Sequence, residues 1–99
     1  MKQGDILEST WGWEQTNADF YIVEKTTDTT AWLRKIGKKV QATGDMTALE
    51  LPDPQVVSAE KPMRRKIKKW EDSPEYVSIN EYAVASAWDG EPVSTSSYA

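Results

Sequence analysis

Residues 11–21 read WGWEQTNADFY, and this stretch decides the first part of the fold. Aromatic rings flank a short polar insert, and the runs on either side are rich in residues that favour β-strands. Two such runs joined by a short polar segment are typical of a β-hairpin. Asn17 suits the left-handed backbone position of such a loop, because the insert contains no glycine. We therefore predict a hairpin with its loop at residues 14–19.

The polar residues of this loop have a structural and a functional interpretation. Thr16 and Asp19 can hydrogen-bond amides that the loop leaves unpaired, which accounts for both without a ligand. In the functional interpretation, Gln15 and Asn17 project from an aromatic platform and read out a partner. The residues favour the structural interpretation, and neither makes this loop a catalytic site.

Outward from the loop, three segments carry the residue types and alternation of β-strands. Residues 5–13, 20–26 and 30–40 predict a three-stranded meander, with a turn at residues 27–29. Further along, Pro52 and Pro54 deny residues 49–57 a central strand but allow an edge strand or a crossing segment.

The last part of the chain predicts shorter elements. Residues 63–70 and 76–79 fit short strands. Residues 80–90 begin with the helix-capping residue Asn80, contain several alanines and end in Gly90, so they predict one short helical turn or two.

These elements describe a mainly β protein with a small, strongly bent antiparallel sheet. A five-stranded barrel of the Src-homology type with a short C-terminal helical turn is the first choice, and an open sheet packed against a short helix is the second. We expect residues 1–92 to form a single domain and residues 93–99 to be a frayed tail.

The composition excludes several classes of chemistry. The 99 residues include no His and no Cys, so nucleophilic Ser-His and Cys-His pairs and ordinary zinc or iron–sulfur sites are absent. No phosphate-binding glycine loop or calcium-binding loop is present, so we expect neither a metal nor a cofactor. The absence of an apolar N-terminal stretch and of cysteine favours the cytoplasm and gives no membrane partner.

Charge is unevenly distributed along the chain. Residues 34–69 carry ten Lys or Arg against four Asp or Glu, whereas residues 70–99 carry six acids and no base. A basic run beside a Trp can follow a phosphate backbone while the ring stacks on a base. The alternative is a solvated edge strand, whose positive charge resists aggregation. The candidate binding residues are Arg64, Arg65, Lys66, Lys68 and Lys69, with Trp70 or Trp32 stacking.

Residues 11–23 resemble the W-G-Y/W-x-Q-T-N-x-x-F-Y-x-V motif of a family of small proteins from phages, prophages and plasmids. Residues 61–66 fall where that family has K-P-x-x-R/K-R, and residues 76–92 resemble its closing Y-x-x-I/L…Y…WDGxP motif. The tail departs from the family, which ends in a Gly- and His-containing segment. The motif residues singled out are Trp13, Gln15, Thr16, Asn17, Asp19, Tyr21, Tyr82, Trp88 and Asp89.

The resemblance implies an accessory protein of a mobile element, without implying a reaction. Our first hypothesis is therefore a protein that binds a host factor stoichiometrically and inhibits host defence, such as CRISPR or restriction machinery, in the cytoplasm of the bacterial host. The second is a small nucleic-acid-binding β-barrel that uses the basic strand. Either would act as a monomer or as a dimer through edge strands.

A third hypothesis is an enzyme built on carboxylates, for example a glycan hydrolase that uses Asp19 and Asp89. Both carboxylates are better explained as caps of their own turns, so we expect no enzymatic activity.

Overall fold

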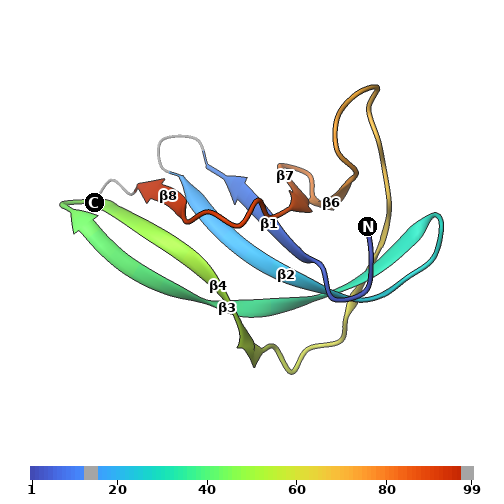
Figure 1. Cartoon of the computed structure of the whole chain (residues 1–99), viewed down its shortest axis with the longest axis horizontal. Helices are drawn as coiled ribbons and strands as arrows, with labels where there is room; N and C mark the ends of the chain where they lie inside the picture. The colour runs from blue at the N-terminus through green and yellow to red at the C-terminus, as the bar shows by residue number, and fades with distance from the viewer. Residues whose placement is uncertain (13–15, 97–99) are drawn as a thin grey trace.

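A computed structural model describes residues 1–12 and 16–96, and its described residues contain strands and no helix. The strands form one antiparallel sheet in the order β6-β7-β1-β2-β3-β4-β8, with β5 also paired to β3 (Figure 1). Their bounds are β1 (Ile6–Trp11), β2 (Asn17–Thr26), β3 (Thr30–Gly44), β4 (Thr47–Val57), β5 (Met63–Lys66), β6 (Tyr76–Asn80), β7 (Ala83–Ala87) and β8 (Val93–Ser96). The prediction of a mainly β, antiparallel fold is confirmed.

The hairpin predicted from residues 11–21 is confirmed as the pair β1–β2, but residues 17–19, which we predicted in the loop, are already paired in β2, and Asn17 does not adopt the predicted left-handed conformation. Trp11 lies opposite Asn17, and Leu7 lies opposite Tyr21. Because side chains alternate between the two faces of a strand, this register places Leu7 and Tyr21 on one face together. The meander continues into β3, where Phe20 of β2 lies opposite Ile36.

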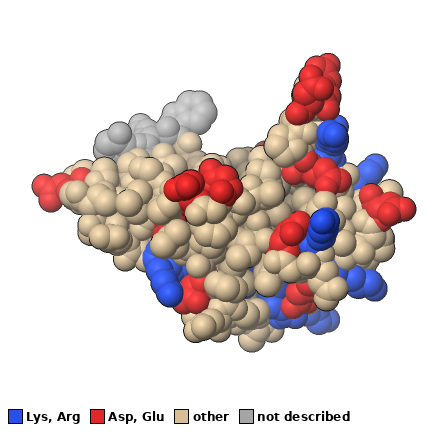
Figure 2. Space-filling view, viewed as in Figure 1, with Lys and Arg blue, Asp and Glu red and all other residues tan. Residues whose placement is uncertain are grey.

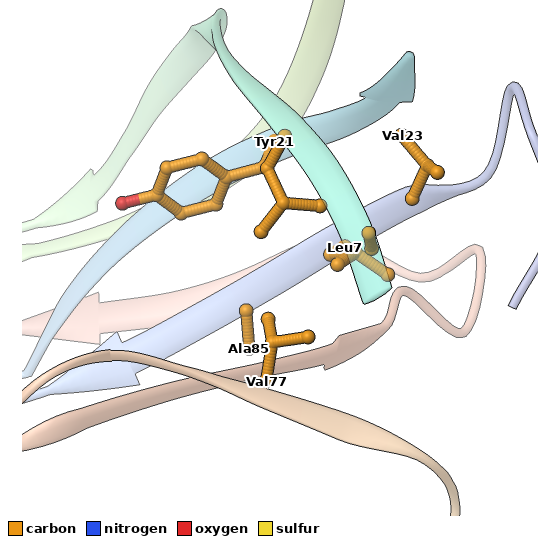
Figure 3. Packing of buried hydrophobic residues seen from close by; sticks show 7 residues of the cluster. Leu7, Tyr21, Val23, Val77 and Ala85 are labelled. Carbon is orange, nitrogen blue, oxygen red and sulfur yellow. The ribbon is translucent and has the colours of Figure 1, made fainter. Parts of the chain in front are cut away.

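The main core lies on one face of the sheet. Its buried residues come from β1, β2, β3, β6 and β7, and Figure 3 shows them packed together: Leu7, Tyr21, Val23, Ala31, Leu33, Val77 and Ala85. Met63 of β5 and Ile67 just after it pack against this cluster. Each fully buried Leu or Val contributes about 1.5–3 kcal/mol, so this cluster holds the strands in register.

β2 is buried on both of its faces, which makes it the centre of the molecule. Tyr21 and Val23 face the main core, whereas Ala18 and Phe20 face the other way and are equally buried. On that second side Lys38 of β3 donates a hydrogen bond to the Ala18 carbonyl at 2.7 Å and forms an ion pair with Glu50 of β4 at 2.7 Å. Glu50 is only 5% exposed, so this ion pair fastens the β3–β4 hairpin onto β2.

The prediction of a closed barrel is wrong, because the sheet remains open. β5 has four residues, and within the described part of the chain its connection to β6 is one isolated bridge, between Lys68 beyond its end and Tyr76. Between those two residues the chain turns outward through Trp70 and Ser73, whose backbone groups are hydrogen-bonded to each other at 2.8 Å. The short strand and this excursion leave one bridge where a barrel needs a continuous ladder.

The prediction of a helical turn at residues 80–90 is also wrong. Asn80 caps a tight turn instead of a helix, because its Oδ1 accepts a hydrogen bond from the Tyr82 amide at 3.1 Å. β7 follows, with Ala83 and Ala85 buried and Val84 exposed, which is the two-residue period of a strand. The small side chains allow β7 to lie between β6 and β1, and this packing overrides the helix propensity of alanine.

The last strand replaces part of the expected tail. Val93–Ser96 pairs with β4 as β8, and Ser96 also exchanges two backbone hydrogen bonds with Thr16. Residues 97–99 lie outside the described residues.

Candidate functional site

The basic run of residues 61–70 is divided by strand alternation. Met63, Arg65 and Ile67 are half-buried, whereas Arg64 and Lys66 are exposed on the opposite side of β5. β5 pairs with the beginning of β3, so that Arg64 lies opposite Trp32 and Lys66 lies opposite Thr30. Residues directly opposite each other share a face, and this register therefore brings two cations, an indole ring and a hydroxyl onto one surface.

A third cation joins this surface from β2. The Lys25 ammonium lies 4.8 Å from the centroid of the Trp32 ring, and the Arg64 guanidinium carbon lies 5.8 Å from it. Each such contact stabilises an exposed cation by about 0.5–1 kcal/mol. Trp32 thus offsets part of the repulsion between the two positive side chains. We call this surface the basic face, formed by Lys25, Thr29, Thr30, Trp32, Arg64 and Lys66.

The basic face contains a shallow hollow of about 380 Å³. Its walls are Thr29, Thr30, Arg64 and Lys66, so every lining side chain can donate a hydrogen bond. Lys and Arg side chains gather toward the end of the molecule that carries the β2–β3 turn, with acidic side chains between them (Figure 2).

One neighbouring cation is already neutralised. Arg34 of β3 forms an ion pair with Glu24 and donates hydrogen bonds to the carbonyls of Ser58 and Glu60, at 2.8 and 2.6 Å. Arg34 therefore anchors the segment between β4 and β5, and its charge does not add to the basic face.

The remaining basic residues predicted from the sequence lie elsewhere. Arg65 donates hydrogen bonds to the Ile79 carbonyl at 3.3 Å and to the Arg64 carbonyl at 2.9 Å, and so faces β6. Lys68 donates a hydrogen bond to the Ser78 hydroxyl at 3.3 Å. Lys69 and Trp70 are exposed in the excursion between β5 and β6, where Trp70 is followed directly by Glu71 and Asp72. Of the predicted set, Arg64, Lys66 and the alternative stacking residue Trp32 reach the basic face.

Lys25, Thr29 and Thr30 were not among the predicted site residues. In the structure Thr26 lies opposite Ala31 and Lys25 opposite Trp32, whereas the predicted turn at residues 27–29 would have placed Lys25 opposite Ala31. The prediction followed the linear run of charge and did not extend this register to the neighbouring strand.

The motif residues form a second cluster, which we call the aromatic rim: Trp11, Asp19, Tyr21 and Tyr82. The rings of Trp11 and Tyr82 lie 5.4 Å apart, and the Trp11 indole donates a hydrogen bond to Asp19 at 3.3 Å. Tyr82 is 68% exposed. Residues from both ends of the sequence resemblance therefore meet at one place.

Tyr21 connects this rim to the main core. Its ring packs within the cluster, and its hydroxyl points away from the other labelled side chains (Figure 3). Burial, and then the negative charge of Asp19, raise the pKa of the Tyr21 hydroxyl above its ordinary value. Asp19 in turn forms an ion pair with Lys35 at 3.4 Å. The rim therefore combines protonated phenol, carboxylate and aromatic surface.

The described part of the polar loop has structural partners. Asn17 donates a side-chain hydrogen bond to the Trp11 carbonyl at 3.4 Å, and the Thr16 amide donates one to the Ser96 carbonyl at 2.9 Å. Both also line a hollow of about 370 Å³, whose wall includes the paired residues Lys38 and Glu50. Trp13 and Gln15 lie outside the described residues.

The closing motif forms a turn that is held by its own groups. The Trp88 indole donates to the Glu91 carbonyl at 2.7 Å, and Asp89 accepts from the Glu91 amide at 2.9 Å. Gly90 has a φ of 90°, which a residue with a side chain rarely adopts. Trp88 and Asp89 thus have a clear structural role.

The two carboxylates considered for hydrolysis do not face each other. Asp19 lies opposite Ser9 of β1. Asp89 instead lies near Glu8, the residue before Ser9, whose side chain points to the other face of the sheet. Burial, and then the charge of Asp89, raise the pKa of Glu8. This arrangement offers no shared cleft for an acid and a base.

Two further properties concern the described residues as a whole. Among residues 1–12 and 16–96, no group of three or more acidic side chains is placed to hold a metal ion. The same residues contain no helix long and apolar enough to cross a membrane.

Comparisons with protein families, with curated proteins and with solved structures give no match for this chain.

Proposed function

We propose that this protein acts by binding, without catalysis, and that its basic face holds single-stranded nucleic acid. The observation that carries the proposal is the arrangement of Lys25 and Arg64 around the Trp32 ring, with Lys66 beside them on the same face. Three cations gathered on one surface repel one another, and a phosphate backbone would relieve that repulsion.

The strand geometry favours an extended single strand. Arg64 and Lys66 stand two residues apart on β5, a separation of about 6.6–6.8 Å along a β-strand. This spacing suits successive phosphates of a stretched single strand, and the half-buried Trp32 offers an edge for base contact. The net charge of −4 repels a polyanion from the rest of the surface, which would confine binding to this face.

Fluorescence anisotropy with a labelled single-stranded oligonucleotide at low salt tests the proposal. The double variant Arg64→Ala/Lys66→Ala should bind at least about tenfold more weakly than the parent, since each lost phosphate contact removes a counterion-release contribution. The matched control is Lys39→Ala/Lys61→Ala, which removes the same charge from exposed lysines outside the basic face. Equal affinity of the parent and the first variant, or no binding by the parent, would refute the proposal.

A second candidate function rests on the aromatic rim. In this proposal the protein is an accessory factor of a phage or plasmid that binds a host defence protein stoichiometrically. Trp and Tyr are enriched in the residues that dominate protein–protein binding energy, and Tyr82 presents such a ring at 68% exposure against Trp11. The resemblance of residues 11–23 and 76–92 to proteins of mobile elements supports the same proposal.

Inhibition of purified CRISPR and restriction nucleases measures this second candidate. The parent should inhibit one nuclease at a stoichiometric ratio, and Tyr82→Ala should weaken inhibition by about tenfold or more, as expected for a central aromatic contact. Trp70→Ala removes an exposed Trp from another part of the molecule and serves as the control. Full inhibition by Tyr82→Ala would exclude the rim as the contact surface.

A further inference from the structure

The hollow in the basic face has a more specific chemistry than the rest of that surface. Thr29 and Thr30 contribute hydroxyl groups 3.4 Å apart, and Arg64 and Lys66 contribute a guanidinium and an ammonium. Among the residues that the structure describes, no carboxylate lines this hollow, and Asp28, the acid on the same turn, is not part of its wall. A small group with several acceptor oxygens and a high negative charge matches such a set of donors.

The floor of the hollow is held in place by the turn that forms it. The Thr27 amide donates to the Thr30 carbonyl at 2.8 Å, and the Thr30 amide donates to the Thr27 hydroxyl at 3.2 Å. From the other side, the Ile67 amide donates to the Thr29 carbonyl at 2.8 Å. The turn and the end of β5 are thus tied together before any ligand arrives, which lowers the entropy lost on binding.

We propose that this hollow binds the terminal phosphate monoester of a nucleic acid strand. A monoester carries about −1.5 to −2 charges near neutral pH and three terminal oxygens, whereas an internal diester carries one charge and two such oxygens. Four donor side chains around a single hollow suit the former better than the latter.

This phosphate-binding hollow, which we call the seat, also lies along the path proposed for the nucleic acid strand. On this point the inference rests on the proposed function. Thr30 and Lys66 form one cross-strand pair, and Trp32 and Arg64 form the pair two residues further along the same face. A phosphate between the first pair therefore places the adjoining nucleotide over the second pair, about 6.6–6.8 Å away. The terminal phosphate sits in the hollow while the following nucleotide meets Trp32.

The first test uses a mononucleotide, so that it does not depend on binding of a longer strand. Amide chemical shifts are followed by NMR during titration with adenosine monophosphate, and adenosine serves as the matched ligand without phosphate. The monophosphate should shift the amides of Thr29, Thr30 and Lys66, and adenosine should leave them unchanged. Equal behaviour of the two ligands would overturn the seat, whatever the outcome with oligonucleotides.

The second test compares one oligonucleotide with a 5′-phosphate, a 3′-phosphate or hydroxyl groups at both ends, labelled internally. The preferred phosphorylated form should bind about tenfold more tightly, which corresponds to roughly 1.4 kcal/mol. Thr30→Val keeps the shape and removes a hydroxyl, and should reduce the ratio of the two affinities to about one, whereas the control Thr10→Val on β1, outside the basic face, should keep the tenfold ratio. Equal binding of all three forms refutes the seat but retains the proposed function, whereas failure of all three to bind refutes the proposed function.

Discussion

Trp32 allows two positively charged side chains from different strands to lie close together on one surface. Arg64 and Lys25 belong to different strands, and their charges alone would push them apart. The indole ring lies within 4.8 Å of one cation and 5.8 Å of the other, and so holds both on one surface. Trp70, by contrast, is 70% exposed and precedes Glu71 and Asp72, where the acids oppose a polyanion. Trp32, which lies between Lys25 of β2 and Arg64 of β5, is therefore the better candidate for contact with nucleic acid.

Ser9 provides a test of packing at the residue scale. Its hydroxyl is buried and has no hydrogen-bond partner among the described residues. A buried polar group without a partner costs about 1–3 kcal/mol. Ser9→Ala should therefore raise the free energy of unfolding by about 1 kcal/mol in urea titrations, and Ser94→Ala, at an exposed position, should change it by less than about 0.5 kcal/mol. A loss of stability in Ser9→Ala would show that the hydroxyl has a partner.

Glu8 gives a pH-dependent prediction. Burial and the charge of Asp89 raise the pKa of Glu8 in the folded protein, so the folded state holds the proton more tightly than the unfolded state. The resulting contribution to stability is lost as the pH rises from the unfolded pKa through the folded pKa. Glu8→Gln should thus be more stable than the parent at about pH 7 and should lose that advantage at about pH 3.

Urea unfolding at both pH values measures the effect. Asp89→Asn should lower the pKa of Glu8 toward its ordinary value and produce part of the same gain. A Glu8→Gln gain of equal size at both pH values would show that packing, and not ionisation, is responsible.

At the scale of elements, Gly37 allows β3 to change partners. β3 pairs with β4 through a register shift between Ile36 and Gly37, and a Cβ at position 37 would lie 2.7 Å from the Cβ of Val56. Gly37→Ala should cost about 1–3 kcal/mol of stability, as overpacking does. Gly44→Ala, whose added Cβ would meet only the Thr47 hydroxyl at 3.2 Å, should cost less stability. Thermal unfolding of both variants and the parent measures the difference. Equal losses would mean that the close approach to Val56 relaxes freely.

The elements also show what sequence could and could not predict. The hairpin of residues 11–21 and the meander were predictable because strong β-formers alternate there around clear turns. Pro52 and Pro54 correctly indicated a partly unpaired strand, since β8 pairs with β4 only at residues 47–50. The prediction of a helical turn at residues 80–90 was wrong because the alanines of residues 83–87 have no strand preference of their own. Their position between β6 and β1 decides their conformation.

The candidate site was predictable in part for the same reason. Alternation along residues 63–67 separates core-facing from exposed side chains and can be read from the sequence. The pairing of β5 with β3, and hence the meeting of Arg64 with Trp32, depends on contacts between segments about thirty residues apart, which local pattern does not encode. The prediction of a closed barrel was wrong for a similar reason, because closure depends on long-range pairing between β5 and β6, which is limited to the bridge between Lys68 and Tyr76.

At the scale of the whole molecule, an acidic protein carries a local basic surface. The net charge of −4 coexists with three cations on the basic face, Lys25, Arg64 and Lys66, while the cations Arg34, Lys38 and Lys35 are paired with acids. Long-range repulsion and local attraction therefore act on a polyanion together, and salt screens both. The difference in salt dependence between the parent and a variant that lacks cations of the basic face therefore reports how many of these cations contact phosphates.

The most direct measurement is the affinity for a single-stranded oligonucleotide across a series of salt concentrations. Each phosphate contact on a single strand contributes about −0.7 to the slope of log affinity against log salt, so three contacts predict a slope near about −2. Arg64→Ala/Lys66→Ala should reduce the slope to about −0.7, and Lys39→Ala/Lys61→Ala should leave it unchanged. A slope near zero in the parent, or one that the first variant does not change, would contradict binding at the basic face.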